Sequence, residues 1–196
     1  MEKLNGKKKL RVSVFISGRG TNLKSLINFS KRKSSPIKIV LIITNNKNAK
    51  GIYFAKKNKI KFLFVNYKNK TKAENKILIN LKNHNINLIC LAGFMKILSK
   101  KIINVHKSRI LNIHPSLLPK YKGLNTHFRM LKNKEKISGC TVHYVSTKLD
   151  SGKIILQKKV PIMKNDTEYS LRRRVLKQER ILYPKAIKSI FTNFSD

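Results

Sequence analysis

The chain has 196 residues, 41 % of them hydrophobic, and this length predicts one domain with its own core. No apolar run approaches the ~20 residues that a membrane span needs, so the composition excludes a transmembrane protein. The formal net charge of +37 is extreme, with 36 lysines against nine arginines.

A chain this basic usually indicates a nucleic acid or another anionic partner. The lysines, however, are spread along the whole chain, and the one arginine cluster is RRR at 172–174. Nucleic-acid sites favour arginine and stacked aromatic residues. Lysine, asparagine and isoleucine, which A/T-rich codons encode, make up 80 of the 196 residues, so coding bias is a competing cause of the charge. We therefore expect no specific nucleic-acid partner; a basic, non-enzymatic nucleic-acid-binding protein is the alternative.

The start of the chain has lysines before an apolar stretch, as a signal peptide does. That stretch is only about six residues long, contains Arg11 and leads directly into a glycine motif, so we interpret it as a first strand. Cys90 and Cys140 both lie in apolar, strand-like segments, which indicates buried, reduced thiols. These features predict a cytoplasmic protein.

Short apolar segments alternate with helical patterns over the first half of the chain. The pattern predicts strands at 10–16, 37–43, 61–65, 87–92 and 109–113. It predicts helices at 22–32, 49–58, 72–83 and 99–105. Thr21 and Asn22 are expected to cap the first helix, and Thr71 to begin the third. This order is typical of an α/β fold with a doubly wound, mostly parallel sheet and helices on both faces.

The order changes after residue 113. A helix is predicted at 125–134, followed by a strand pair at 139–145 and 153–162 and a long helix at 167–190. No linker, repeat or low-complexity insert interrupts the chain. We expect a single domain over residues 1–196, with a mononucleotide-binding half at about 10–113 and a closing half at about 114–196.

A glycine motif, SGRGTN at 17–22, joins the first strand to the first helix. In open α/β sheets, the free N–H groups of a helix N-terminus bind phosphate at such a turn. Gly18 and Gly20 allow close approach of the backbone, and a side chain at position 20 is expected to block it. The third glycine of the dinucleotide fingerprint is absent. The motif favours a phosphomonoester, and an ordinary strand-to-helix turn is the alternative.

The stretch RILNIHPSLLPKYKGLNTH, at 109–127, presents Asn112 and His114 at the carboxyl end of a predicted parallel strand. Residues two apart point to the same side of a strand, and ligands of such sheets bind at this edge. An amide donor and an imidazole that face one spot can stabilise a carbonyl oxygen becoming an oxyanion. The alternative is a structural histidine that caps the strand end.

Asp150, one of only eight carboxylates, lies in the predicted turn between the last two strands. In a functional role it would orient a protonated His114 and accept a proton from an attacking amine. The alternative is an ordinary turn aspartate. Ser116 suggests a rival Ser-His-Asp hydrolase, but Pro115 separates it from His114 and the GxSxG context is absent. His127 and His143 have no spacing that indicates a metal site.

Six separated segments, in this order, resemble the phosphoribosylglycinamide formyltransferase family, the folate-dependent glycinamide ribonucleotide transformylases of purine synthesis. These segments are ISGRGTNL (16–23), LAGFMKIL (91–98), LNIHPSLLPKYKG (111–123), GCTVHYV (139–145), LDSGKIILQKKVPI (149–162) and ERILYP (179–184). The resemblance covers nearly the whole chain. It implies a Rossmann-like formyltransferase fold and transfer of a formyl group from 10-formyltetrahydrofolate to the amine of glycinamide ribonucleotide, without a metal.

By position, the resemblance implies a role for each matching residue. The catalytic residues would be Asn112, His114 and Asp150. The ribonucleotide would be bound by Gly20, Thr21, Asn22 and Glu179. The folate would be bound by Asn112, by Met95, Lys96, Ile97 and Leu98 together with the 146–150 turn, and by Lys72 or Lys70. The second half of the chain would then complete the folate site, and the protein would be a monomer or weak homodimer that acts on small-molecule substrates.

The sequence departs from the family pattern at three places. Arg180 stands where histidine follows the glutamate, Leu176 where a polar residue is common, and Asn125 where histidine is frequent. These departures affect the ribonucleotide contacts rather than the reaction. Two relatives with the same Asn-x-His and Asp core are alternatives: a methionyl-tRNA formyltransferase would need a further C-terminal domain, and a formyltetrahydrofolate deformylase an N-terminal one. The length of the chain favours neither.

Overall fold

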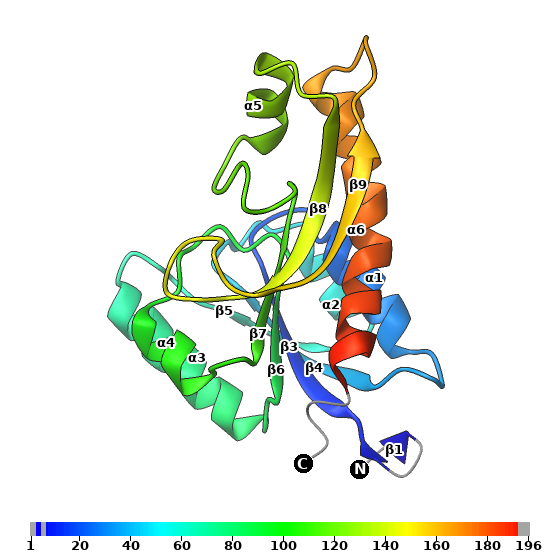
Figure 1. Cartoon of the computed structure of the whole chain (residues 1–196). Helices are drawn as coiled ribbons and strands as arrows, with labels where there is room; N and C mark the ends of the chain where they lie inside the picture. Colours follow the sequence, from blue (N-terminus) through cyan, green and yellow to red (C-terminus); the bar gives the residue numbers. More distant parts are fainter. Residues whose placement is uncertain (1–2, 5–6, 192–196) are drawn as a thin grey trace.

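The computed structural model describes residues 3–4 and 7–191, and its main feature is a seven-stranded mixed sheet of order β5-β4-β3-β6-β7-β8-β9 (Figure 1). The strands are β3 (Leu10–Ile16), β4 (Ile37–Thr44), β5 (Lys61–Phe64), β6 (Leu88–Leu91), β7 (Ile110–His114), β8 (Ile137–Tyr144) and β9 (Ile154–Pro161). The first five in spatial order are parallel, whereas β8 and β9 continue the sheet antiparallel. The predicted doubly wound α/β fold is confirmed.

Helices cover both faces of the sheet. They are α1 (Thr21–Ser30), α2 (Ile52–Lys57), α3 (Lys70–Asn83), α4 (Lys100–Val105), α5 (Thr126–Lys132) and α6 (Glu168–Ile190). Helices α1 and α6 lie on one face and α3 and α4 on the other, while α5 lies beside the projecting end of β8 (Figure 1). None of the helices in the described ranges is both long enough and apolar enough to cross a membrane.

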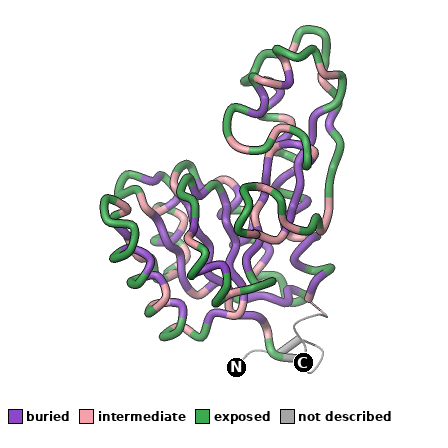
Figure 2. Tube along the Cα trace, turned by 60° about the vertical axis from the view of Figure 1, so that its left-hand side comes forward, coloured by how far each residue is buried: buried purple, intermediate pink, exposed green. Residues whose placement is uncertain are grey.

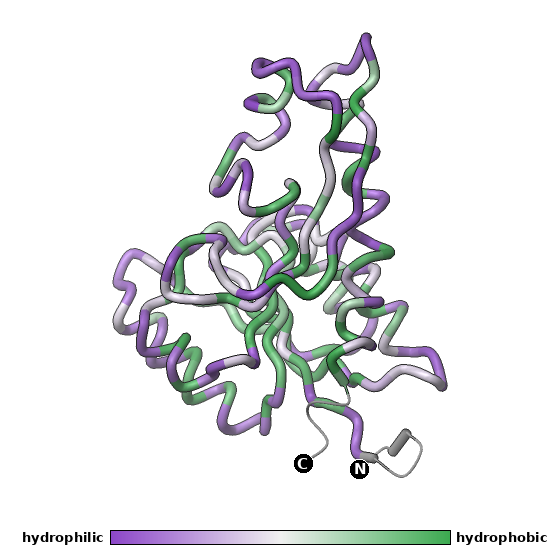
Figure 3. Tube along the Cα trace, in the orientation of Figure 1, coloured by the Kyte–Doolittle hydropathy of each residue, from purple (hydrophilic) through white to green (hydrophobic). Residues whose placement is uncertain are grey.

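The strands are buried on both faces, which explains their continuous runs of isoleucine, leucine and valine. In β3, Val14 and Ile16 belong to the hydrophobic cluster under α1 and α6. Phe15 points to the other side and packs in the cluster with Ile77 of α3. Figure 2 shows the burial along the central strands, and Figure 3 shows that these strands are largely hydrophobic, whereas hydrophobic and hydrophilic residues alternate along the helices.

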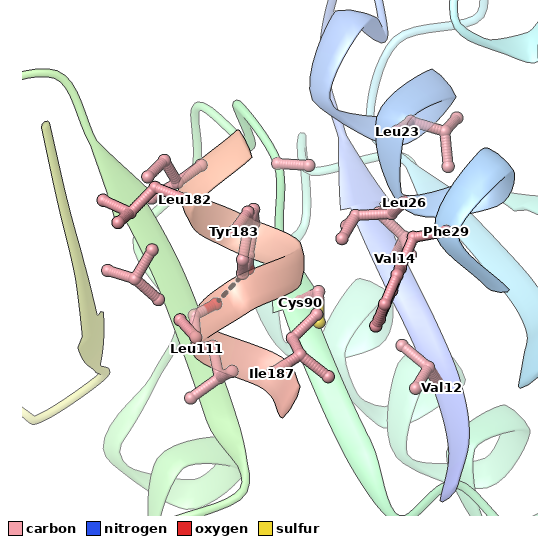
Figure 4. Close-up of a cluster of buried hydrophobic side chains, with 14 of the residues drawn as sticks. Val12, Val14, Leu23, Leu26, Phe29, Cys90, Leu111, Leu182, Tyr183 and Ile187 are labelled. Carbon is pink, nitrogen blue, oxygen red and sulfur yellow. Dashed lines mark hydrogen bonds between the residues drawn. The ribbon is translucent and has the colours of Figure 1, made fainter. Parts of the chain in front are cut away.

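Helix α6 is anchored to the sheet by Tyr183. The Tyr183 hydroxyl lies 3.1 Å from the backbone oxygens of both Leu91 and Leu111, in β6 and β7 (Figure 4). Cys90 lies beside this tyrosine, and both Cys90 and Cys140 are free, buried thiols, as predicted. Burial raises the pKa of each thiol to about 12, so both are protonated and unreactive.

The strand predicted at 10–16 is confirmed, and β1 (Lys3–Leu4) and β2 (Lys7–Lys8) form a small antiparallel pair before it. Two local predictions were wrong. Helix α1 begins at Thr21, and its N-cap is Gly20, which makes no side-chain capping bond. Helix α3 begins one residue before Thr71, because the Asn69 side chain accepts a hydrogen bond from the Lys72 amide and so caps the helix.

Gly20 is required by packing. Its backbone has a φ of 71°, in the left-handed region, and an added Cβ would lie 2.5 Å from the Cα of Gly51. A side chain here would therefore collide with the turn before α2, whether or not a ligand also approaches the Gly20 backbone. An added Cβ at Gly18 meets nothing within 4 Å.

We predict that Gly20→Ala lowers the free energy of unfolding by about 2 kcal/mol or more, because it combines left-handed strain with a backbone clash. Gly18→Ala should change it by less than about 0.5 kcal/mol, since its Cβ enters open space. Urea denaturation of both variants measures the difference. Equal stabilities would show that the contact between residues 20 and 51 does not restrict the turn.

Candidate active site

Strands β7 and β8 gather polar side chains on one face. Asn112 and His114 occupy alternate positions at the end of β7. In the antiparallel ladder, Asn112 lies opposite His143 and His114 lies opposite Thr141. Residues directly opposite each other share a face of the sheet. The register therefore brings the two predicted residues together and adds His143 to them.

The carboxylate of Asp150 faces both imidazoles. Asp150 lies in the 145–153 connection, in a left-handed conformation with a φ of 45°. Its Oδ2 accepts a hydrogen bond from the Gly123 amide at 2.9 Å and lies 3.4 Å from His114 Nδ1. Its Oδ1 lies 3.7 Å from His143 Nε2, too far for a hydrogen bond. Oδ1 thus accepts no hydrogen bond from the residues that the structure describes, although only 9 % of the Asp150 side chain is exposed.

Both ring nitrogens of His114 face oxygen atoms. Its Nε2 lies 2.8 Å from the backbone oxygen of Tyr121, which can only accept, so Nε2 carries a hydrogen. Its Nδ1 faces Oδ2 of Asp150 at 3.4 Å. The ring is therefore held in a fixed orientation beside the carboxylate.

His143 is arranged as a neutral ring. Burial lowers the pKa of His143, and its Nδ1 lies 2.9 Å from the backbone oxygen of Tyr144. Nε2 is then a free acceptor, and the Asn112 Nδ2 lies 3.2 Å from it. One amide hydrogen of Asn112 is thereby fixed, and the other is free to bind a ligand. Sequence reasoning missed this role, because only the β7–β8 register pairs the two residues.

A cavity of about 630 Å³ opens beside this cluster, a size typical of small-molecule sites. Its lining includes all three predicted catalytic residues and four predicted folate contacts: Asn112, His114, Asp150, Met95, Lys96, Ile97 and Leu98. The turn residues 146, 147, 149 and 150 also line it. Lys72 does not line the cavity. It lies in the first turn of α3, where its amide binds the capping Asn69.

The predicted ribonucleotide residues do not line this cavity. Gly20, Thr21 and Asn22 lie at the start of α1, and Glu179 lies in α6. The first N–H groups of α1 have no partner within the helix and point out of its N-terminus. Asn22, in the first turn of α1, donates from Nδ2 to Oε2 of Glu179 at 2.6 Å, although 157 residues separate them. The Oδ1 of Asn22 is buried and has no hydrogen-bond partner among the described residues. The turn therefore offers an anion site beside a free buried acceptor.

Glu179 is almost completely buried. Burial raises the pKa of its carboxyl group, and the Asn22 hydrogen bond and the charges of Arg172 and Arg180 oppose this only in part. A raised pKa means that ionising this carboxyl costs more in the folded protein than in the unfolded chain. A buried acid with this penalty is a common property of functional sites.

Two alternative interpretations of the sequence do not agree with the structure: a hydrolase with Ser116 as nucleophile, and a nucleic-acid surface built on the arginines at 172–174. Ser116 donates to the backbone oxygen of Lys120 at 2.7 Å and makes no hydrogen bond to His114, so it is not an activated nucleophile. The three clustered arginines diverge: Arg174 binds Asp166, Arg173 lies over the Tyr169 ring, and Arg172 lines the cavity. They therefore form no common surface for nucleic acid.

Over the described ranges, no group of three His, Cys, Asp or Glu side chains has an arrangement that would hold a metal ion.

Comparison with known proteins identifies the family. The model described as formyl transferase matches residues 10–187. Phosphoribosylglycinamide formyltransferase of Haemophilus influenzae is 41 % identical over 91 % of this chain and 85 % of that protein. The crystal structure of phosphoribosylglycinamide formyltransferase from Anaplasma phagocytophilum has 43 % identity and a TM-score of 0.89, over 95 % of this chain and 88 % of that chain.

The chain therefore belongs to the formyl transferase family. Within that family it groups with the phosphoribosylglycinamide formyltransferases, which confirms the resemblance that its motifs carry. A longer relative, the trifunctional purine biosynthetic protein adenosine-3 of Homo sapiens, is 39 % identical over 94 % of this chain. The chain spans only 18 % of that protein.

We predict that Glu179→Gln stabilises the protein at neutral pH. With a raised pKa in the folded state, wild-type stability falls as pH rises from the ordinary carboxyl value of 4.5 through the folded pKa, and it stays lower above that value. Glutamine still accepts from Asn22 but carries no charge. The melting temperature of the variant should therefore exceed that of the wild type at pH 8, and the two should converge toward pH 4. The opposite trend would show that ionised Glu179 is stabilised by its neighbours.

Proposed function

We propose that this chain transfers a formyl group from 10-formyltetrahydrofolate to the amine of glycinamide ribonucleotide, in de novo purine biosynthesis. The observation that carries the proposal is the Asp150 carboxylate, whose Oδ2 faces His114 and whose Oδ1 faces His143, the residue that contacts the Asn112 amide. An amine that attacks a formyl carbon needs a proton acceptor and donors for the oxyanion. The four side chains supply both.

The roles follow from the balance of bonds and protons. The amine nitrogen bonds to the formyl carbon, and the formyl oxygen becomes an oxyanion. The free hydrogen of the Asn112 amide and the charge of protonated His114 stabilise that oxygen. Asp150 Oδ1 accepts the proton that the amine loses. Cleavage of the bond between the formyl carbon and the folate nitrogen then releases tetrahydrofolate. Its nitrogen takes up the proton that Asp150 accepted, which restores the carboxylate.

The two substrates are assigned to two adjoining regions. The folate would occupy the cavity lined by residues 95–98 and the 146–150 turn, with Lys72 or Lys70 near its outer end. The phosphate of the ribonucleotide would bind the N–H groups at 20–22, and Glu179 with Asn22 would meet the rest of the molecule. We propose that both regions belong to one domain, in which residues 114–196 complete the site built on residues 10–113.

The direct test mixes the protein with 10-formyltetrahydrofolate and glycinamide ribonucleotide and measures tetrahydrofolate and formylated ribonucleotide. We expect equal amounts of the two products, and no turnover when the ribonucleotide is left out. Release of formate without the ribonucleotide would instead indicate a deformylase. Tight, salt-resistant binding of a nucleic acid without any formyl transfer would favour the non-enzymatic alternative.

Two variants test the catalytic roles. Asp150→Asn should lower kcat by on the order of 10²–10⁴, because the amide cannot accept the amine proton. Asn112→Ala should cost a similar factor through the lost oxyanion donor. Neither should change the Michaelis constants strongly, and Asn104→Ala, an exposed asparagine of α4, serves as the control. A variant of Asp150 or Asn112 that kept half of the wild-type kcat would contradict its assigned role.

His143→Phe tests the positioning of Asn112. Phenylalanine keeps a ring in the buried site but removes the acceptor that fixes the Asn112 amide. We expect kcat to fall on the order of 10-fold, the effect of one lost hydrogen bond, and less than in Asn112→Ala. An unchanged kcat would mean that Asn112 is oriented without His143.

A further inference from the structure

Three loops of the sheet meet at one residue, Ser17. It directly follows β3, whose neighbours in the sheet are β4 and β6. Its amide donates to the backbone oxygen of Gly93 at 3.1 Å. Its hydroxyl accepts from the Met95 amide at 2.8 Å and donates to Oδ1 of Asn45 at 2.5 Å. Its backbone oxygen accepts from the Asn46 side chain at 3.1 Å.

The joined loops carry different parts of the two substrate regions. Ser17 is the first residue of the SGRGTN turn, assigned above to the ribonucleotide phosphate. Gly93 and Met95 begin the loop that lines the folate cavity. The two ends of β3 and β6 that hold these loops lie next to each other in the sheet, so one short side chain spans both. Within the described part of the chain, the bond from Met95 to Ser17 is the side-chain hydrogen bond that links residues 17–22 to residues 93–98.

Within the loop at 93–98, Phe94 is anchored by packing against Phe15 and Tyr67, whereas the backbone at Met95 is held by its hydrogen bond to Ser17. The side chains of Met95 and Ile97 are 62 % and 69 % exposed, so they contribute little packing. Gly93 adopts a left-handed backbone conformation with a φ of 80°, and an added Cβ would meet nothing within 4 Å, so no side-chain packing holds the loop at this residue. A hydroxyl can accept from one loop while it donates to another, which an alanine at the same position cannot do.

We propose that the Ser17 hydroxyl is a positioning group that couples the two substrate regions. A folate bound in the cavity restricts the motion of residues 93–98. The hydrogen bonds that link Met95, Ser17 and Asn45 then restrict the phosphate-binding turn as well. The ribonucleotide has the reciprocal effect, because coupling between two binding sites is mutual. This inference rests on the proposed function, and Ser17 itself touches neither reacting group.

Tetrahydrofolate and glycinamide ribonucleotide form a suitable pair of probes, since together they cannot react. Calorimetric titration gives the affinity for the ribonucleotide with and without saturating tetrahydrofolate. We expect tetrahydrofolate to raise that affinity about 5-fold or more in the wild type, within the usual range of coupling. In Ser17→Ala the ratio should fall close to one, and in Ser17→Thr, which keeps a hydroxyl, it should recover.

The control is Ser25→Ala. The Ser25 hydroxyl also makes one hydrogen bond, to the backbone oxygen of Arg180 at 2.6 Å, but it contacts neither loop. This variant should keep the wild-type ratio. If Ser17→Ala does not fold, Asn45→Ala removes the acceptor of the same hydroxyl and should lower the ratio in the same way.

The outcomes separate the two claims. Failure of either ligand to bind the wild-type protein would overturn the proposed function, and the coupling with it. Binding of both ligands with a wild-type ratio of one would overturn the coupling alone. A Ser17→Ala variant that weakens both ligands but keeps the wild-type ratio would show a purely structural serine, and would also overturn it.

Discussion

The site depends on how one carboxylate is held. Asp150 lies in a left-handed turn, is tied to the Gly123 amide, and faces two imidazoles. A carboxylate with so little exposure loses most of its hydration, and this loss must be offset by fixed donors and positive charge. The amide of Gly123 supplies one such donor, to Oδ2, and His114 faces the same oxygen. Asp150 lines the cavity, and its Oδ1 accepts no hydrogen bond from the described residues.

The antiparallel end of the sheet is what makes this arrangement possible. Pairing of β8 against β7 sets His143 beside Asn112, and the connection after β8 returns Asp150 to both histidines. The two imidazoles have different partners. Nε2 of His114 donates to the backbone oxygen of Tyr121 and its Nδ1 faces Asp150. Burial lowers the pKa of His143, whose Nε2 lies 3.2 Å from the Asn112 amide nitrogen. Two residues of one type thus have different surroundings within one cluster.

The few acidic residues of this basic chain are mostly held by specific contacts inside the fold. Of the six acids within the described ranges, five have specific internal partners: Glu74 binds the Ser99 amide, Glu135 the Tyr121 hydroxyl, Asp150 the Gly123 amide, Asp166 Arg174, and Glu179 Asn22. The lysines, by contrast, lie mainly on exposed surfaces and tolerate drift. The net charge is therefore a weak indicator of function, and the positions of the acidic residues are a better one.

Local patterns were enough to predict the sheet, because buried parallel strands are continuous apolar runs that alternate with helices. They also predicted Asn112 and His114 as a pair, since alternate residues of a strand share a side. What they could not predict depends on long-range geometry. The role of His143 requires the register of β8, and the Gly20 conformation follows from its contact with Gly51. The bond from Asn22 to Glu179 joins helices at opposite ends of the chain, and only family resemblance indicated Glu179.

The proposed mechanism requires that Asp150 deprotonates the amine while the start of α1 holds the phosphate. A crystal structure with glycinamide ribonucleotide and tetrahydrofolate tests it most directly. The amine nitrogen should lie about 3 Å from Asp150 Oδ1, and phosphate oxygens about 3 Å from the backbone nitrogens at 20–22. A phosphate bound elsewhere, or an amine nitrogen directed away from Asp150, would contradict the account.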